Sequence, residues 1–220
     1  MKKDIMVRQV CVGPFQVFAY IVSCPASREA VIIDPGGDEE RLSALVAEDN
    51  LKVKYILNTH GHLDHVAANE VLKQRLDAPT CMHEEDKAFF SEGVGKESCE
   101  KELGLPPPEP VDMTLKHGDI LDVGTMKVEV IHTPGHTPGS VCFLIHGNLF
   151  TGDTLFVGAV GRTDLTGSSF DELLTSLREK IITLPEDTVV WPGHDYGEMP
   201  SSTLSWEMEE NPYITDFILE

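Results

Sequence analysis

Hydrophobic and polar positions along the chain follow two alternating periods, one typical of strands and the other of helices. Short apolar runs rich in β-branched and aromatic residues predict strands, and apolar residues spaced three and four apart predict amphipathic helices. The expected strands are Val17–Val22, Ala30–Ile33, Val53–Leu57, Lys127–Ile131, Val141–Ile145 and Thr188–Trp191. The expected helices are Glu39–Asp49, Val66–Arg75, Glu84–Phe90 and Phe170–Ile181. This alternation predicts an α/β protein.

The last of these helices has the clearest pattern. Leu173, Leu174, Leu177 and Ile181 share one face, and Ser168 or Ser169 is positioned to cap its start. A further closing helix is expected in the segment SSTLSWEMEENPYI. The one linker-like segment, GLPPPEP at residues 104–110, lies near the middle of the chain and favours an extended conformation. We therefore expect a single domain spanning residues 1–220.

Composition and charge indicate a globular protein and argue against some classes of partner. The chain has 220 residues, of which 41% are hydrophobic, so a sizeable core is expected. Its 17 Lys and Arg residues against 37 Asp and Glu residues give a net charge of −20. Nucleic acids and anionic membranes are bound largely through basic residues, so neither is an expected partner. The five cysteines are widely spaced and odd in number, which predicts reduced thiols and a cytoplasmic location.

The uncharged segment Gln9–Ser27 follows Lys2, Lys3 and Arg8 and has some features of an export signal. Gln9, Pro14 and Gln16 interrupt any apolar helix there. Two core strands separated at Gly13-Pro14 explain the segment better. The sequence contains no run of 18 apolar residues, so no membrane-spanning helix is expected.

Four polar clusters each follow an apolar strand. They are THGHLDH at residues 59–65, TPGHTPGS at 133–140, TGD at 151–153 and PGHDYG at 192–197. Strand ends on one edge of a sheet are where α/β proteins build sites, because a rigid scaffold there presents loop side chains. Imidazole and carboxylate together suit zinc, iron or manganese.

The clusters supply seven candidate ligands, which are His60, His62, Asp64, His65, His136, Asp153 and His194. One structural zinc needs only four ligands, so seven predict two metal ions that share a carboxylate. Alone, His136 or Asp153 would be read as an ordinary turn residue. His132 is open to two interpretations, a group that supports the metal ligands or a packing residue, and His83 lies at a strand end with no motif around it.

With these motifs, the chain resembles the metallo-β-lactamase superfamily. Within it, the chain is similar to the glyoxalase II group of hydroxyacylglutathione hydrolases and to the related persulfide dioxygenases. The motifs VIIDPGG, THGHLDH, TPGHTPGS, TGDTLF, GRTD and PGHDYG carry the resemblance, which covers the chain from Phe15 to about Pro212. It implies a four-layer αββα sandwich with the metals at one edge of the two sheets.

The resemblance also implies how the ligands divide. His60, His62 and His136 would hold one metal, Asp64, His65 and His194 the other, and Asp153 would bridge them. Asp34 would support the ligands from the DPGG turn. Arg162 and Tyr196 match residues that contact the glutathione moiety, although Arg162 could instead only pair with Asp164. The chain lacks the full C-terminal helical domain of glyoxalase II, which puts glutathione specificity in doubt.

The leading hypothesis is therefore a hydrolase for a hydroxyacylglutathione-like thioester that works through a metal-bound hydroxide. Two divalent ions, most often zinc in such sites but with iron or manganese open, would lower the pKa of the water. Asp64 and Asp153 would be the catalytic carboxylates. The first alternative is a persulfide dioxygenase with one iron on His60, His136 and Asp153. The second, a non-catalytic metal-binding protein, fits less well because the site has no cysteine and two carboxylates.

Overall fold

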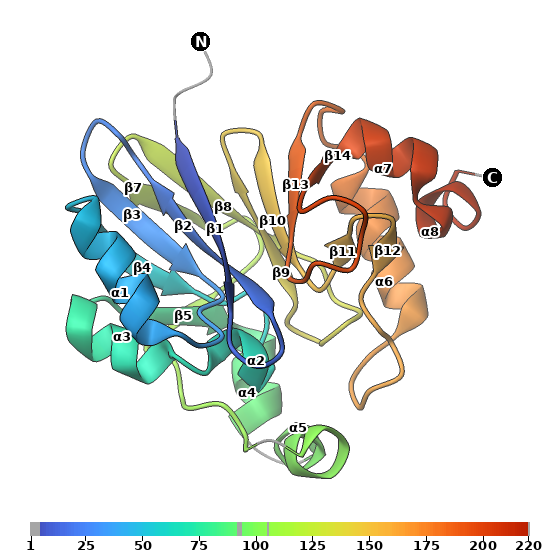
Figure 1. Cartoon of the computed structure of the whole chain (residues 1–220). Helices are drawn as coiled ribbons and strands as arrows, with labels where there is room; N and C mark the ends of the chain where they lie inside the picture. The colour runs from blue at the N-terminus through green and yellow to red at the C-terminus, as the bar shows by residue number, and fades with distance from the viewer. Residues whose placement is uncertain (1–4, 92–93, 105, 220) are drawn as a thin grey trace.

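The structure is a computed structural model that describes residues 5–91, 94–104 and 106–219. It has two six-stranded sheets packed face to face, with helices on both outer sides (Figure 1). The first sheet contains β1 (Met6–Val12), β2 (Val17–Ser23), β3 (Glu29–Ile33), β4 (Lys52–Leu57), β5 (Thr80–His83) and β6 (Met113–Leu115), in that order. Its first three strands are antiparallel and the rest run parallel to β3.

The second sheet is mostly antiparallel. Its order is β14 (Ser202–Thr203), β13 (Val189–Pro192), β10 (Asn148–Gly152), β9 (Val141–Ile145), β8 (Met126–His132) and β7 (Ile120–Val123). Only β10 and β13 pair in parallel, so their ends reach the same edge. A separate two-stranded ribbon, β11 (Leu155–Phe156) and β12 (Ala159–Val160), follows β10.

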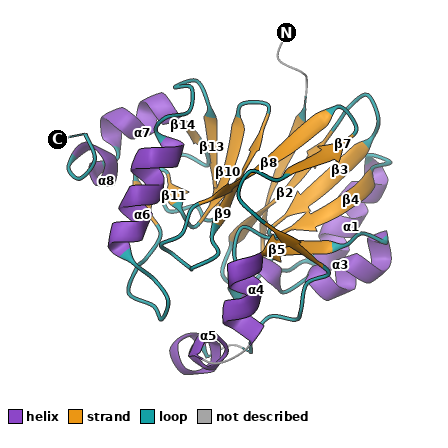
Figure 2. Cartoon of the chain, turned by 180° about the vertical axis from the view of Figure 1, so that it is seen from behind, coloured by secondary structure: helices purple, strands orange, loops and turns teal. Residues whose placement is uncertain are grey.

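The helices cover the two outer faces (Figures 1 and 2). The first sheet carries α1 (Glu39–Glu48) and α3 (Asn69–Leu76). The second carries α6 (Phe170–Ser176), its π-helical continuation η2 (Leu177–Ile181), α7 (Leu204–Glu210) and α8 (Pro212–Thr215). Four further short helices are α2 (Leu63–Val66), α4 (Glu84–Ser91), α5 (Val94–Ser98) and η1 (Cys99–Leu103).

Alternation along β2 shows how the layers are held together. Phe18, Tyr20 and Val22 enter the core between the two sheets, whereas Ala19 and Ile21 pack under the helices of the first sheet. Successive side chains of a strand point to opposite faces, so a strand covered on both sides is apolar throughout. A third core joins the second sheet to α6 and η2. Three cores between four layers confirm the predicted αββα sandwich.

The predicted strands are all present, each within one or two residues of its expected ends. Two of the predicted helices are each divided into two shorter ones. The helix expected over Val66–Arg75 is broken into α2 and α3, because the Ala68 N–H donates to the Pro35 carbonyl rather than continuing the helix. The closing segment also forms two helices, since Asn211 caps the start of α8 and Pro212 occupies its first position.

Helix α6 and the linker-like segment match the predictions only in part. Ser169 caps α6 as predicted, by accepting from the Glu172 N–H. The helix expected over Phe170–Ile181 changes from α to π geometry at Leu177, for which the sequence gives no physical reason. Of the linker-like segment, residues 106–110 form an irregular connection to β6, while Leu105 lies outside the described residues. Within the described part of the chain, no helix has the length and apolar character needed to cross a membrane.

Candidate metal centre

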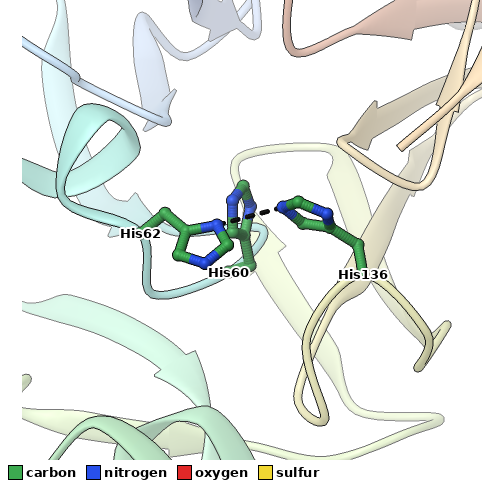
Figure 3. A group of neighbouring side chains, drawn as sticks. All are labelled: His60, His62 and His136. Atoms are coloured by element: carbon green, nitrogen blue, oxygen red, sulfur yellow. Dashed lines mark hydrogen bonds between the residues drawn. The ribbon is translucent and has the colours of Figure 1, made fainter. Parts of the chain in front are cut away.

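All seven predicted ligands lie together at one edge of the two sheets. The loop after β4 supplies four of them, the turn after β8 supplies His136, and the ends of β10 and β13 supply Asp153 and His194. His62 and His136 face each other across the gap between two loops, with their Nδ1 and Nε2 atoms 3.0 Å apart (Figure 3). The strand ends therefore converge as the sequence predicted.

The ligand atoms form three overlapping groups, within each of which they lie less than 4.8 Å apart. We call His60, His62 and His136 the three-histidine half, and Asp64, His65 and His194 the mixed half. The third group is His60, His65 and Asp153. The Asp153 carboxylate lies 3.6 Å from His136 Nε2 and 3.7 Å from His194 Nε2, so it reaches both halves.

The residues fit a pair of bound cations. Four buried polar atoms in the centre have no hydrogen-bond partner, namely His60 Nε2, His65 Nε2, His194 Nδ1 and Asp153 Oδ1. Leaving a buried polar atom unpaired costs about 1–3 kcal/mol, so a cluster of them requires a compensating ligand. Imidazole nitrogens and carboxylates are the donors that zinc, iron and manganese accept.

Contacts on the far side of each ring set which nitrogen faces the centre. The His136 Nδ1–H donates to the Arg162 carbonyl over 2.9 Å, which leaves the lone pair on Nε2. The His65 Nδ1–H likewise donates to Asp34 over 3.1 Å, so Nε2 faces Asp153. Such contacts orient metal-binding histidines and raise their basicity. Both rings therefore turn Nε2 towards the centre.

The charges of the centre also favour metal binding. Burial lowers the pKa of His62 to about 3 and lowers the pKa of His60 well below its usual range, so both rings are neutral at pH 7. Burial opposes ionisation of Asp153, but His65 and the other neighbouring histidines hold its pKa well below the ordinary value. Burial also opposes protonation of His65, but the carboxylates of Asp153 and Asp64 outweigh it and raise the pKa of that ring. His60 and His62 are thus neutral imidazoles beside an ionised carboxylate, which are protonation states that metal ligands need, and a bound cation would displace the proton of His65.

The packing leaves no room for a side chain at Gly193. A β-carbon there would lie 2.4 Å from Asp153 Oδ1 and 2.9 Å from the His65 ring. The PGHDYG motif therefore needs glycine before His194, because the backbone passes directly against the centre.

Asp86 is a buried residue beside the centre that the sequence did not reveal. Its fully buried carboxylate accepts from the N–H groups of Gly61 and Gly139, at 2.8 and 2.6 Å, and from the Thr137 hydroxyl at 2.8 Å. Gly61 lies between His60 and His62, and Thr137 follows His136. Asp86 therefore ties together the two loops of the three-histidine half. The sequence offers little sign of this role, because Asp86 follows Glu84 and Glu85 and acidic residues are ordinary in the first turn of a helix.

Asp34 occupies the supporting position that the resemblance implied. Its carboxylate accepts from the Thr59 N–H at 2.7 Å, from the Thr59 hydroxyl at 2.6 Å and from His65. Thr59 precedes His60, so Asp34 holds the beginning of the ligand loop. Phe90, which the sequence did not single out, packs edge-on against the His62 ring at 5.5 Å between centroids.

A cavity of about 200 Å³ opens onto the centre. It is lined by Phe15, Leu165, Arg162, Tyr196 and the metal-facing side chains of His62, Asp64, His136, Asp153 and His194. The exposed Tyr196 ring stacks on His194, with 4.9 Å between centroids and 4° between planes. Arg162 also lines the cavity, and its guanidinium pairs with Asp164 through two bonds of 2.7 and 2.9 Å. Both predicted substrate-binding residues thus border the centre.

His132 and His83 do not belong to this arrangement. Their rings stack on each other at 4.0 Å between centroids. Of the two interpretations of His132, the structure supports packing, because its side chain is directed at His83 and at the Pro138 carbonyl. His117 is exposed at the surface.

Comparison with known proteins decides the family. The family model described as the metallo-β-lactamase superfamily matches residues 12–194. The chain belongs to this superfamily. The resemblance found in the motifs is thereby confirmed, and membership places the chain among metallo-hydrolases that bind their metals through His and Asp clusters.

Relatives that are named for different reactions have similar sequence identities to this chain. The hydroxyacylglutathione hydrolase GloC of Haemophilus influenzae is 36% identical over 192 residues, which are 85% of this chain and 88% of that protein. The human mitochondrial persulfide dioxygenase ETHE1 is 34% identical over 214 residues, 96% of this chain and 76% of that protein. The crystal structure of TTHA1623 in a di-iron-bound form matches with a TM-score of 0.80 and 37% identity, covering 94% of this chain and 100% of that one.

Proposed function

We propose that this member of the superfamily is a thioester hydrolase that acts on a hydroxyacylglutathione-like substrate with two metal ions bound. The observation that carries the proposal is the complete set of seven ligand side chains in two halves, with the Asp153 carboxylate within 4 Å of nitrogens from both. One ion would use fewer of these groups. The similarity to GloC and to a protein crystallised with two irons supports the same reading.

The bound ions would supply a Lewis acid and a water of lowered pKa. His60, His62 and His136 would hold one ion and Asp64, His65 and His194 the other, with Asp153 between them. The Asp64 side chain is 19% exposed and faces the cavity, so it can accept a hydrogen bond from the attacking water and orient it. No serine or cysteine nucleophile is needed for this reaction.

The thiol carrier would lie along Arg162 and Tyr196. A carboxylate on the carrier can replace Asp164 as the partner of the Arg162 guanidinium, since that ion pair is largely exposed and contributes little stability. The Tyr196 ring offers an apolar face beside His194. Substrate recognition and metal binding would thus meet at the same edge of the sandwich.

A persulfide dioxygenase is the second candidate, because ETHE1 matches 96% of this chain. The two reactions are separated by parallel assays on one preparation. Hydrolysis of an S-(2-hydroxyacyl)glutathione is followed by release of free thiol, and oxidation of glutathione persulfide is followed by oxygen uptake. We expect thiol release without oxygen uptake.

The matched control is Asp153→Asn, which keeps the size of the side chain and removes its charge. Thiol release that disappears in this variant supports the hydrolase. Oxygen uptake that disappears in the variant, with no thiol release by the unsubstituted protein, would instead establish the dioxygenase. If neither activity is found in the metal-loaded protein, the non-catalytic alternative is favoured.

A further inference from the structure

A second cluster of metal-ligating side chains lies outside the centre described above. It joins His83 at the end of β5, Glu85 in the first turn of α4 and His132 at the end of β8. One ligand atom from each lies within 4.8 Å of the other two. None of the three residues belongs to the seven-residue centre, and the proposed hydrolysis does not use them.

Both histidine rings have an unprotonated nitrogen available. His132 Nε2 lies 2.8 Å from the Pro138 carbonyl oxygen, which can only accept, so Nε2 carries the proton and the neutral ring has its lone pair on Nδ1. The Glu85 N–H donates to His83 Nδ1 over 3.4 Å, which places that ring's lone pair on Nδ1 as well. A bond of that length is weak, so little is lost when a metal replaces it.

The charges around the cluster favour a divalent cation. Burial, together with the neighbouring His132, lowers the pKa of His83 to about 4, so this ring is neutral at pH 7. The Glu85 side chain is exposed and offers a carboxylate and a path from solvent. Glu84 and Asp119 also lie close enough to act on His83 electrostatically. Two imidazoles and one carboxylate suit zinc, nickel or copper, whereas calcium and magnesium prefer oxygen ligands.

We propose that His83, Glu85 and His132 form a third metal site, which takes a borderline divalent ion such as Zn²⁺ and links the two sheets. The link follows from the topology, because β5 belongs to the first sheet and β8 to the second. Zinc lies about 2.0–2.2 Å from such ligands, so binding draws the three atoms closer together and turns the stacked rings towards a common point. Water completes the coordination on the exposed side.

The test is the number of zinc ions bound per chain. The full chain is dialysed at pH 7 against a series of free Zn²⁺ concentrations, and bound zinc is counted by elemental mass spectrometry. We expect three ions per chain at saturation. Glu85→Gln and His132→Gln should each leave two ions bound and raise the dissociation constant of the third at least about tenfold. The third ion should also raise the melting temperature of the unsubstituted protein, because it binds only the folded state.

Glu84→Gln is the matched control. Glu84 is the neighbouring exposed carboxylate, it pairs with Lys116 at 3.0 Å and it is not a member of the cluster, so its removal changes the local charge equally. The control should still bind three ions. Saturation of the unsubstituted protein at the same number of ions as Glu85→Gln and His132→Gln would overturn the proposal. So would a third ion that both Glu85→Gln and His132→Gln retain with unchanged affinity, or one that Glu84→Gln weakens as much as Glu85→Gln does.

Discussion

The two halves of the metal centre are held by two buried aspartates that act at different points. Asp86 supports the three-histidine half without touching a ligand ring, since its partners are two backbone N–H groups and a hydroxyl from the loops that carry the ligands. Asp34 touches a ligand of the mixed half directly, through His65 Nδ1. One carboxylate therefore fixes the spacing between loops, and the other fixes the orientation of a ring. Substitutions should separate these two effects.

The largest effect is expected for Asp153, the residue that both halves share. Asp153→Asn removes the charge that faces His65, His136 and His194. We expect kcat/KM for the thioester to fall roughly a thousandfold or more, because an interaction worth several kcal/mol is lost. Metal content should fall for both halves together. Steady-state kinetics with elemental analysis of the same sample checks this, and loss of one ion only would contradict a shared position.

Asp64→Ala should affect one half alone. Its carboxylate lies 3.6 Å from His194 Nε2 and lines the cavity. We expect the ion of the mixed half to be lost or weakly bound, with activity reduced by about two to three orders of magnitude. Metal analysis and kinetics test this expectation. Unchanged turnover with unchanged metal content would refute the two-metal account.

The buried charge of Asp86 should make stability depend on pH. Burial raises the pKa of Asp86 to about 6, from an ordinary value of 3.8, although its hydrogen bonds oppose the shift. Between these values the folded state keeps a proton that the unfolded state has released. The stabilising contribution is thus complete below about pH 4 and is lost as the pH rises through 6.

A shift of this size corresponds to about 3 kcal/mol. The difference in unfolding free energy between the unsubstituted protein and Asp86→Asn should shrink by that amount from pH 4 to pH 7. Urea denaturation at four pH values, with a chelator present to remove metal effects, measures it. A difference that does not change with pH would show that Asp86 titrates normally.

The smallest effects on metal binding are expected from substitutions of the two supporting aspartates, Asp86 and Asp34. Asp86→Asn should weaken metal binding in the three-histidine half, because the amide NH₂ group faces a backbone N–H that needs an acceptor. Asp34→Asn should weaken binding most in the mixed half, because His65 loses the carboxylate that orients it, and less in the three-histidine half, which Asp34 reaches only through Thr59. Each loss should be about ten- to hundredfold. Competition with a chromophoric chelator resolves the two affinities.

Asp112→Asn is the control for these variants. Asp112 also accepts from a backbone N–H and a hydroxyl, both of Thr80, but its partners lie outside the centre. Both metal affinities should stay unchanged in that variant. If Asp34→Asn and Asp86→Asn weaken the same ion equally, the two halves are not supported separately.

The sequence predicted the fold class, the main strands and the set of ligand-type residues that the structure brings together. These features are local, because short apolar strands run directly into motifs such as THGHLDH. Asp86 could not be predicted in the same way. Its partners lie 25, 51 and 53 residues away, and two of the three are backbone N–H groups, which leave no pattern in the sequence.

The break between α2 and α3 has a similar cause. A backbone contact from Ala68 to the distant Pro35 decides where the helix is interrupted. The short strands β6, β11, β12 and β14, of two or three residues each, are too brief to show a period of their own. The pairing of Arg162 with Asp164 was among the expected outcomes, and the structure shows it together with the position of Arg162 at the cavity.

The proposed function requires that two metal ions share the centre through Asp153. Anomalous X-ray diffraction from crystals of the protein, recorded across the absorption edge of the metal found by elemental analysis, would locate each ion. We expect two peaks beside Asp153, one among His60, His62 and His136 and one among Asp64, His65 and His194. A single peak at full occupancy, bound only by His60, His136 and Asp153, would contradict it and would favour the one-iron chemistry of a dioxygenase.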